Sequence, residues 1–210
     1  MTKELTLHAS KRTDVGKGAS RRLRRIDDAI PAILYGGEHP PEMLTLDHNK
    51  LLRFMENEAV YSQVLTIDIE GKTQKAVLKA IQRHPFKPKI LHMDFLRITG
   101  KEKVTMHIPL HFKGENKAPG VKEGGIVSHY LTEVEVSCLP KNLPEFIEVD
   151  MSNLTLDNPM HLSEIVCPKN VTLVALTQGQ DNPVVAIHLP RAAVEKSAAD
   201  EEEATTDKKD

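Results

Sequence analysis

Alternating apolar and polar residues in the first half of the chain predict a series of short β-strands. Gly36-Gly37 separates two of these runs and Glu70-Gly71-Lys72 separates two others, as turns between antiparallel strands do. The series predicts a small β-barrel or a curled sheet of about five or six strands. The predicted strands cover residues 5–9, 32–35, 43–46, 64–69, 75–81 and 90–98.

Two short helices are predicted between these strands. Residues 14–20 contain two glycines and predict a mobile loop, after which Ser20 is placed to cap a helix at 21–26. Pro31 is predicted to end this segment before the next strand begins. A second helix is predicted from Asn49, where leucine and methionine recur at helical spacing.

The second half of the chain lacks a strong helical pattern, and its apolar runs are rich in β-branched residues and interrupted by proline and glycine. It predicts an all-β domain, either sandwich-like or open, so the fold class of the whole chain is mainly β. Composition and charge change at Thr99-Gly100-Lys101, which predicts domains at 1–99 and 100–191. Residues 192–210 predict an acidic flexible tail. The apolar runs cover residues 104–112, 126–139, 146–149, 171–176 and 184–189.

Charge is distributed unequally between the two halves, although the formal net charge is only −2. Residues 1–100 hold 17 Lys and Arg against 12 Asp and Glu, whereas residues 101–210 hold 11 against 18. Eight of the nine arginines precede residue 100, and guanidinium groups suit forked contacts with phosphate and base edges. The first half is therefore the candidate reader of RNA or DNA.

Composition also argues against several other classes of protein. The two cysteines, Cys138 and Cys167, form no CxxC pair, so we interpret both as small apolar fillers rather than disulfide or zinc-binding residues. No apolar stretch reaches 18 residues, and the amino terminus lacks the apolar segment of a secretory signal. We expect a cytoplasmic protein with no membrane partner, no cofactor and no small-molecule substrate.

The strongest local signal is the basic segment at 1–26, which carries eight Lys and Arg against two acidic residues. Each phosphate neutralised by such a segment releases counterions, which drives binding and makes it dependent on salt. Gly16 and Gly18 also allow close approach of the backbone to an anion. The alternative interpretation is a solvated basic surface.

A second signal combines the basic loop at 82–89 with the strand that follows it. Strand periodicity places alternate apolar residues on one face and His92 and Asp94 on the other. On an exposed face, such a pair offers a hydrogen-bond donor and an acceptor to RNA base edges or sugars. A solvated surface is again the alternative.

The scarcity of aromatic residues favours structured RNA over single strands. Aromatic residues make up 4% of the chain and Trp is absent, so reading of unpaired bases by stacking is disfavoured. Tyr35, at a strand end before two glycines, is the aromatic residue best placed to be exposed. A core tyrosine is the alternative.

The chain contains five distinctive motifs: GKGASRRLRR, PAILYGG, QRHPFKPKILHMDF, PGVKEGGI and LPKNLPEFIEVD. Together they resemble the long form of the bacterial large-subunit ribosomal protein that binds 5S rRNA, the general stress protein CTC family. The resemblance covers about residues 3–190. It implies an amino-terminal β-barrel that binds the internal loop E region of 5S rRNA through its widened minor groove. It also implies a carboxy-terminal β domain elsewhere on the large ribosomal subunit, and no catalysis.

The resemblance also implies a set of RNA-contacting residues. One of these residues is Arg24 in the first predicted helix. The spacing between the helix arginines and Pro31 varies by one residue in the family, so Arg21, Arg22 or Arg25 can take the role of Arg24 instead. Gln82 and Arg83 are expected as neighbours of the site. The positions implied directly by the motifs are Arg12, Lys17, Arg24, Tyr35, His92 and Asp94.

Two other functions compete with this one. In the first, the acidic β domain binds a partner protein and the basic half only steers association. In the second, His92 and Asp94 belong to a metal hydrolase whose site is completed by a further histidine such as His84.

Overall fold

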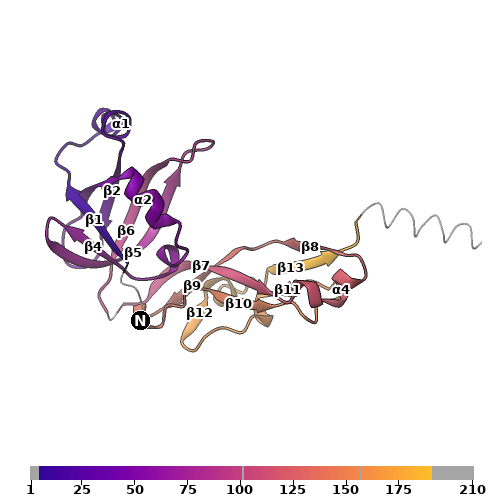
Figure 1. The fold of residues 1–210 in the computed structure, drawn as a ribbon. Coiled ribbons are helices and arrows are strands. Elements are labelled where there is room, and N and C mark those ends of the chain that lie inside the picture. Colours follow the sequence, from indigo (N-terminus) through magenta and orange to yellow (C-terminus); the bar gives the residue numbers. More distant parts are fainter. Residues whose placement is uncertain (1–4, 101, 157, 191–210) are drawn as a thin grey trace, which may run out of the picture. The chain divides into compact units, whose positions relative to one another are not determined.

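The computed structural model describes residues 5–100, 102–156 and 158–190 and is mainly β (Figure 1). Six strands form a closed barrel in the order β1-β3-β2-β6-β5-β4, which confirms the predicted barrel. Contacts group the chain into two compact units. Of the described residues, the first unit comprises those between 5 and 108 with 135–145 and 168–172, and the second comprises those in 109–134, 146–167 and 173–190. The barrel strands are β1 (Thr6–Lys11), β2 (Ala29–Tyr35), β3 (Glu42–Asp47), β4 (Leu65–Ile69), β5 (Lys72–Arg83) and β6 (Ile90–Arg97).

The barrel is closed by β1, which pairs in parallel with β4 over Thr6 to Ala9 and antiparallel with β3 at Ser10 and Lys11. Glu70 and Gly71 both take positive φ, of 51° and 88°, as a tight hairpin turn between β4 and β5 requires. Alternate residues of β3, β4 and the later part of β6 are buried, as the sequence pattern predicted, whereas β2 and the middle of β5 contain consecutive buried residues. The fully buried side chains of this core include Leu34, Leu44, Leu65, Ile67, Met93 and Phe95.

Three helices accompany the barrel strands: α1 (Lys17–Ile26), α2 (His48–Met55) and α3 (Ala59–Ser62). The predicted second helix is confirmed, although it begins at His48 and is capped by Asp47, whose side chain accepts from the Lys50 amide at 3.0 Å. Leu51 of α2 and Val60 of α3 are fully buried in the barrel core. Helix α1 buries no residue completely and stands outside the ring of strands (Figure 1).

The predicted start of the first helix is wrong. The helix begins at Lys17, three residues before the expected cap, because Gly16 takes a φ of 95° and turns the chain into the helix. Gly18 therefore lies inside the helix, and Ser20 does not cap it. The Ser20 hydroxyl accepts a hydrogen bond from Arg12 instead, at 3.1 Å.

The prediction that Pro31 precedes the strand is also wrong, because β2 begins at Ala29 and includes this proline. Pro31 is registered with Thr45 of β3, whereas pairing of β2 with β6 begins only at Ala32. Proline is tolerated there because its missing N–H removes no hydrogen bond from the ladder with β6.

The rest of the described chain forms a four-stranded sheet with the order β10-β7-β9-β12 and a three-stranded sheet with the order β11-β13-β8. Two predicted strands are shorter than expected: the run at 126–139 is divided by a turn, and the run at 171–176 becomes helical after Leu173. The predicted boundary at 99–101 stays a prediction, and the predicted tail at 192–210 lies outside the described residues. The strands are β7 (Val104–Lys113), β8 (Ile126–His129), β9 (Glu133–Cys138), β10 (Ile147–Asp150), β11 (Met160–His161), β12 (Val171–Leu173) and β13 (Pro183–His188). The helical turns are η1 (Glu115–Lys117), α4 (Pro119–Lys122), η2 (Pro140–Asn142), η3 (Leu162–Glu164) and α5 (Val174–Thr177).

We expect Gly36→Ala to lower the free energy of unfolding by about 2–3 kcal/mol. Gly36 takes a φ of 95°, and an added Cβ would lie 2.7 Å from Leu96 Cδ1. Gly71→Ala is the matched control, because Gly71 has a φ of 88° with nothing within 4 Å of an added Cβ. This control should lose only about 1 kcal/mol from backbone strain. Urea unfolding followed by circular dichroism measures both values, and equal losses would contradict the steric argument.

Candidate RNA interface

Helix α1 presents two different faces. Ala19, Ser20, Leu23 and Arg24 are half-buried, at the spacing that places residues on one face of a helix. Lys17 and the other α1 arginines (Arg21, Arg22 and Arg25) are exposed. The helix therefore rests on the barrel through a narrow stripe and directs most of its cationic groups into solvent.

A cleft of about 690 Å³ lies between α1 and the loop that joins β5 to β6. We call it the basic cleft. Five of its side chains are cationic and one is an aspartate, so its formal charge is strongly positive. Its lining residues are Arg21, Arg24, Arg25, Asp28, His84, Lys87, Lys89 and Leu91.

The positive charge of the basic cleft is only weakly neutralised from within the protein. Asp28 pairs with Lys89 at 3.3 Å, so its charge is already shared. Among the residues that the structure describes, the arginines lining the cleft form no ion pair, and Nε of Arg24 is buried without a hydrogen-bond acceptor. The contact between Arg22 and Asp14 spans 3.9 Å with both side chains exposed, so it contributes little.

Arg12 connects α1 to the end of β1. Its amide donates to the Met43 carbonyl at 3.0 Å, and Nη1 of its half-buried side chain donates to the Ser20 hydroxyl at 3.1 Å. Its Nε is buried without an acceptor. Arg12 is therefore held in a defined position while its guanidinium keeps unused donor capacity.

The second group of predicted residues lies on β6 and the two strands beside it, and we call it the β6 face: Tyr35 of β2, Gln82 of β5, and His92 and Asp94 of β6. Nδ1 of His92 lies 2.6 Å from Oδ1 of Asp94, and the two side chains are 26% and 33% exposed. Gln82 of β5 is registered directly opposite His92. The imidazole is thus oriented by a carboxylate, and both groups remain accessible to a ligand.

Tyr35 lies on the same face as Asp94. Ile33 of β2 is registered with Asp94, and Tyr35, two residues after Ile33, points to the same side of the sheet as Ile33. Tyr35 is half-buried. Burial raises the pKa of the Tyr35 phenol, and the negative charge of Asp94 raises this pKa further. The phenol is therefore neutral at physiological pH and can both donate and accept a hydrogen bond.

Two irregularities in the β5–β6 ladder shape this surface. The register shifts between Leu78 and Ala80, which places the small, exposed Ala80 opposite Asp94 and leaves the carboxylate uncovered. A second shift lies between Gln82 and Arg83. There Leu91, one of the alternate apolar residues that the periodicity places on the same face as Met93 and Phe95, is only half-buried and lines the basic cleft. Since Leu91 immediately precedes His92, the basic cleft borders the β6 face.

Several residues beside the predicted set also lie at this surface. His84, Lys87 and Lys89 line the basic cleft, and the proline-rich basic loop in the sequence was the signal for them. Phe86 in the same loop is 80% exposed, with its ring 4.7 Å from that of His84. Arg83 is engaged elsewhere, since it donates to the Tyr61 hydroxyl at 2.5 Å.

Comparison with known proteins identifies the family. Residues 7–95 match the model of the ribosomal L25p family, and residues 103–191 match the carboxy-terminal domain of ribosomal protein TL5. The large ribosomal subunit protein bL25 of Hahella chejuensis is 50% identical over 207 residues, covering 97% of this chain and all of the relative. The bL25 of Marinobacter nauticus is 49% identical over 205 residues, covering 96% of this chain and 97% of the relative. This chain belongs to the bL25 family.

Membership of the bL25 family decides the class of function. The chain is a protein of the large ribosomal subunit, associated with cytoplasmic ribosomes, and it is not an enzyme. Across the described ranges, no helix is long and apolar enough to cross a membrane.

The metal-hydrolase hypothesis gains no support from the geometry. His84, its suggested third ligand, accepts weak hydrogen bonds through Nδ1 from the amides of Phe86 and Lys87, at 3.4 and 3.3 Å. In the part of the chain that the structure describes, no group of three or more His, Cys, Asp or Glu residues is placed to hold a metal ion.

We expect Asp94→Asn to lower the pKa of Tyr35 while leaving it above 10.0, because burial, the larger cause of the raised pKa, persists. Absorbance of the phenolate against pH measures this pKa in a background that carries Tyr61→Phe and Tyr130→Phe. Asp68→Asn is the control, since Asp68 pairs with His8 at 3.0 Å in a similar arrangement. An unchanged pKa in Asp94→Asn would show that the carboxylate does not act on Tyr35.

Proposed function

We propose that this chain binds 5S rRNA through its barrel, at the internal loop E region that the motif resemblance implies. In this proposal the basic cleft and Arg12 hold the RNA backbone, while the β6 face contacts base edges or 2′-hydroxyl groups. Lys17 adds an exposed charge at the start of α1. The observation that carries the proposal is the basic cleft, whose arginines lack internal partners among the described residues and border a polar surface with fixed hydrogen-bonding groups.

The shape of the site favours structured RNA. The minor groove of A-form RNA is wide and shallow and displays 2′-hydroxyls and base edges, so the outer face of a sheet can reach them. His92 and Asp94 present groups of this kind from a rigid strand. Phe86 supplies a single exposed ring beside the cleft, whereas proteins that read single strands use several stacking aromatics.

The two parts of the site perform different tasks in this proposal. Arginines on a helix neutralise phosphates and therefore supply affinity that depends on salt but not on sequence. The His92–Asp94 pair places a carboxylate near RNA, which is unfavourable unless it accepts a hydrogen bond from a hydroxyl or an amino group. The carboxylate therefore supplies discrimination rather than affinity.

We expect Arg24→Ala to weaken binding to 5S rRNA and to reduce the slope of log K against log salt by roughly 0.7–0.9, the value for one lost phosphate contact. Arg12→Ala should act in the same direction. Binding is measured with the full chain between about 50 and 200 mM salt, the range in which counterion release dominates. Arg53→Ala is the control, because Arg53 is an exposed arginine of α2 that lies outside the cleft. A slope in Arg24→Ala equal to that in Arg53→Ala would contradict the assignment.

We expect Asp94→Ala to reduce the preference for the cognate RNA by about 1–3 kcal/mol, the range for a specific polar contact. The comparison RNA is 5S rRNA with loop E replaced by a regular duplex. Binding to this comparison RNA should stay constant or tighten, since a negative charge is removed. Loss of affinity for both RNAs in equal proportion would contradict a role in discrimination.

The same pair of RNAs tests the proposed function as a whole. Tight binding by the full chain that requires loop E and persists at physiological salt would support it. Equal, salt-sensitive binding to both RNAs would leave only a basic surface, and the protein-interaction hypothesis would then take its place.

A further inference from the structure

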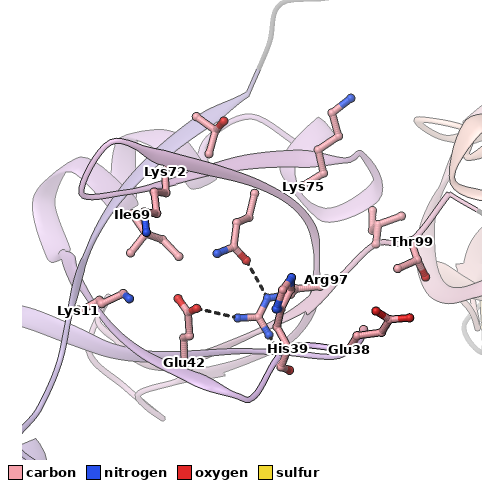
Figure 2. A pocket seen from close by; sticks show the side chains of 13 residues that line it. Lys11, Glu38, His39, Glu42, Ile69, Lys72, Lys75, Arg97 and Thr99 are labelled. Atoms are coloured by element: carbon pink, nitrogen blue, oxygen red, sulfur yellow. Dashed lines mark hydrogen bonds and ion pairs between the residues drawn. The ribbon is translucent and has the colours of Figure 1, made fainter.

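A second cationic site lies at the mouth of the barrel, at the end where β1, β2, β4 and β6 finish and β3 and β5 begin. A cavity of about 720 Å³ opens there (Figure 2). None of its lining residues lines the basic cleft. Along β6, the cleft residue Leu91 and the mouth residue Arg97 are separated by about 20 Å of strand. The mouth and the cleft are therefore separate sites on the barrel.

Arg97 forms the floor of the mouth, and its side chain is only 6% exposed. Nε donates to the Gln74 side chain at 2.7 Å, and Nη1 donates to the carbonyls of Pro40 and His39 at 3.0 and 3.3 Å. Nη2 lies 3.3 Å from Oε1 of Glu42 without the geometry of a hydrogen bond. The other carboxylate oxygen of Glu42, Oε2, is buried and also lacks a donor. The floor thus holds one unused donor beside one unused acceptor.

The rim of the mouth adds lysines. Figure 2 shows the side chains of Lys11 and Glu42 pointing into the ring of strands, Lys72 beside Ile69, and Lys75 directed outward. Over the described ranges, the amines of Lys11, Lys72 and Lys75 form no ion pair. Four cations (Lys11, Lys72, Lys75 and Arg97) line the mouth against two carboxylates (Glu38 and Glu42), so its formal charge is positive. Positive charge in a concave, partly buried opening concentrates the electrostatic potential there, so the mouth attracts anions.

We propose that the barrel mouth binds the phosphate group of a ribose phosphate. The amines of Lys11 and Lys72 and Nη2 of Arg97 donate to phosphate oxygens, as charge-assisted hydrogen bonds. A ribose hydroxyl donates to Oε2 of Glu42, the carboxylate oxygen that lacks a donor within the protein. Two sources offer this chemistry: a nucleotide of an RNA backbone and a free nucleotide.

The test titrates the isotopically labelled full chain with ribose 5-phosphate, inorganic phosphate and a short RNA duplex without loop E. We expect saturable shifts in the amide resonances of mouth residues such as Gly37, Thr73 and Thr99. Lys11→Gln with Lys72→Gln should weaken binding about tenfold. Lys50→Gln with Lys141→Gln removes the same charge from exposed positions outside the mouth and should leave these shifts unchanged.

Glu42→Gln tests the hydroxyl contact separately from charge. This variant should bind inorganic phosphate more tightly, because a negative charge is removed, and should lose the preference for ribose 5-phosphate. Tighter mouth binding of the duplex identifies RNA as the source, and tighter binding of ribose 5-phosphate identifies a free nucleotide. Absence of mouth shifts with all three probes, or equal weakening in the two lysine pairs, would overturn the proposal. Because none of the three probes contains loop E, the outcome at the mouth does not depend on whether the chain recognises loop E of 5S rRNA.

Discussion

Closure of the barrel by β1 is the constraint on which the rest of the first unit depends. β1 pairs with β4 through its first residues and with β3 through its last two, so a single strand satisfies both edges of the sheet. Closure also fixes the end of β1 beside β3, where the Arg12 amide donates to the Met43 carbonyl. Helix α1 is therefore held between two fixed strand ends, at Lys11 and Ala29. Its arginines keep a defined place on the barrel although the helix buries no residue completely.

The parts of this structure that sequence alone predicts are those governed by local periodicity. Alternation along β6 correctly separates Met93 and Phe95, in the core, from His92 and Asp94, on the surface. Glu70-Gly71 predicts the β4–β5 hairpin because few residues other than glycine adopt positive φ at low cost. The basic segment at 1–26 and the basic loop at 82–89 are likewise visible as local runs of charge.

The parts that sequence does not predict depend on pairing between distant residues. The basic cleft exists only because α1 and the β5–β6 loop, about sixty positions apart in the chain, lie next to each other. The bulges at Lys79 and Leu91 follow from the register between β5 and β6. Because of them, Asp94 is uncovered and Leu91 lies outside the core. Pro31 is acceptable inside β2 because pairing of β2 with β6 begins only at Ala32, which the residues next to Pro31 in the sequence do not reveal. The early start of α1 reflects one backbone angle, at Gly16.

Each cationic site of the barrel holds one arginine nitrogen that is buried without an acceptor, but the two arginines differ in their other bonds. In the mouth, Arg97 donates to backbone carbonyls and to Gln74 and pairs with Glu42, so it stabilises the turn after β2, and the lysines supply most of the attraction for anions. In the basic cleft, Arg24 is half-buried with a donor that has no acceptor, which is unfavourable in the free protein. A buried donor without an acceptor lowers the stability of the free protein, and this loss is recovered when a ligand supplies the acceptor. Phosphate is the acceptor group that matches the geometry of guanidinium best. The incomplete hydrogen bonding of α1 therefore supports the proposal that this helix binds RNA and does not serve only to pack on the barrel.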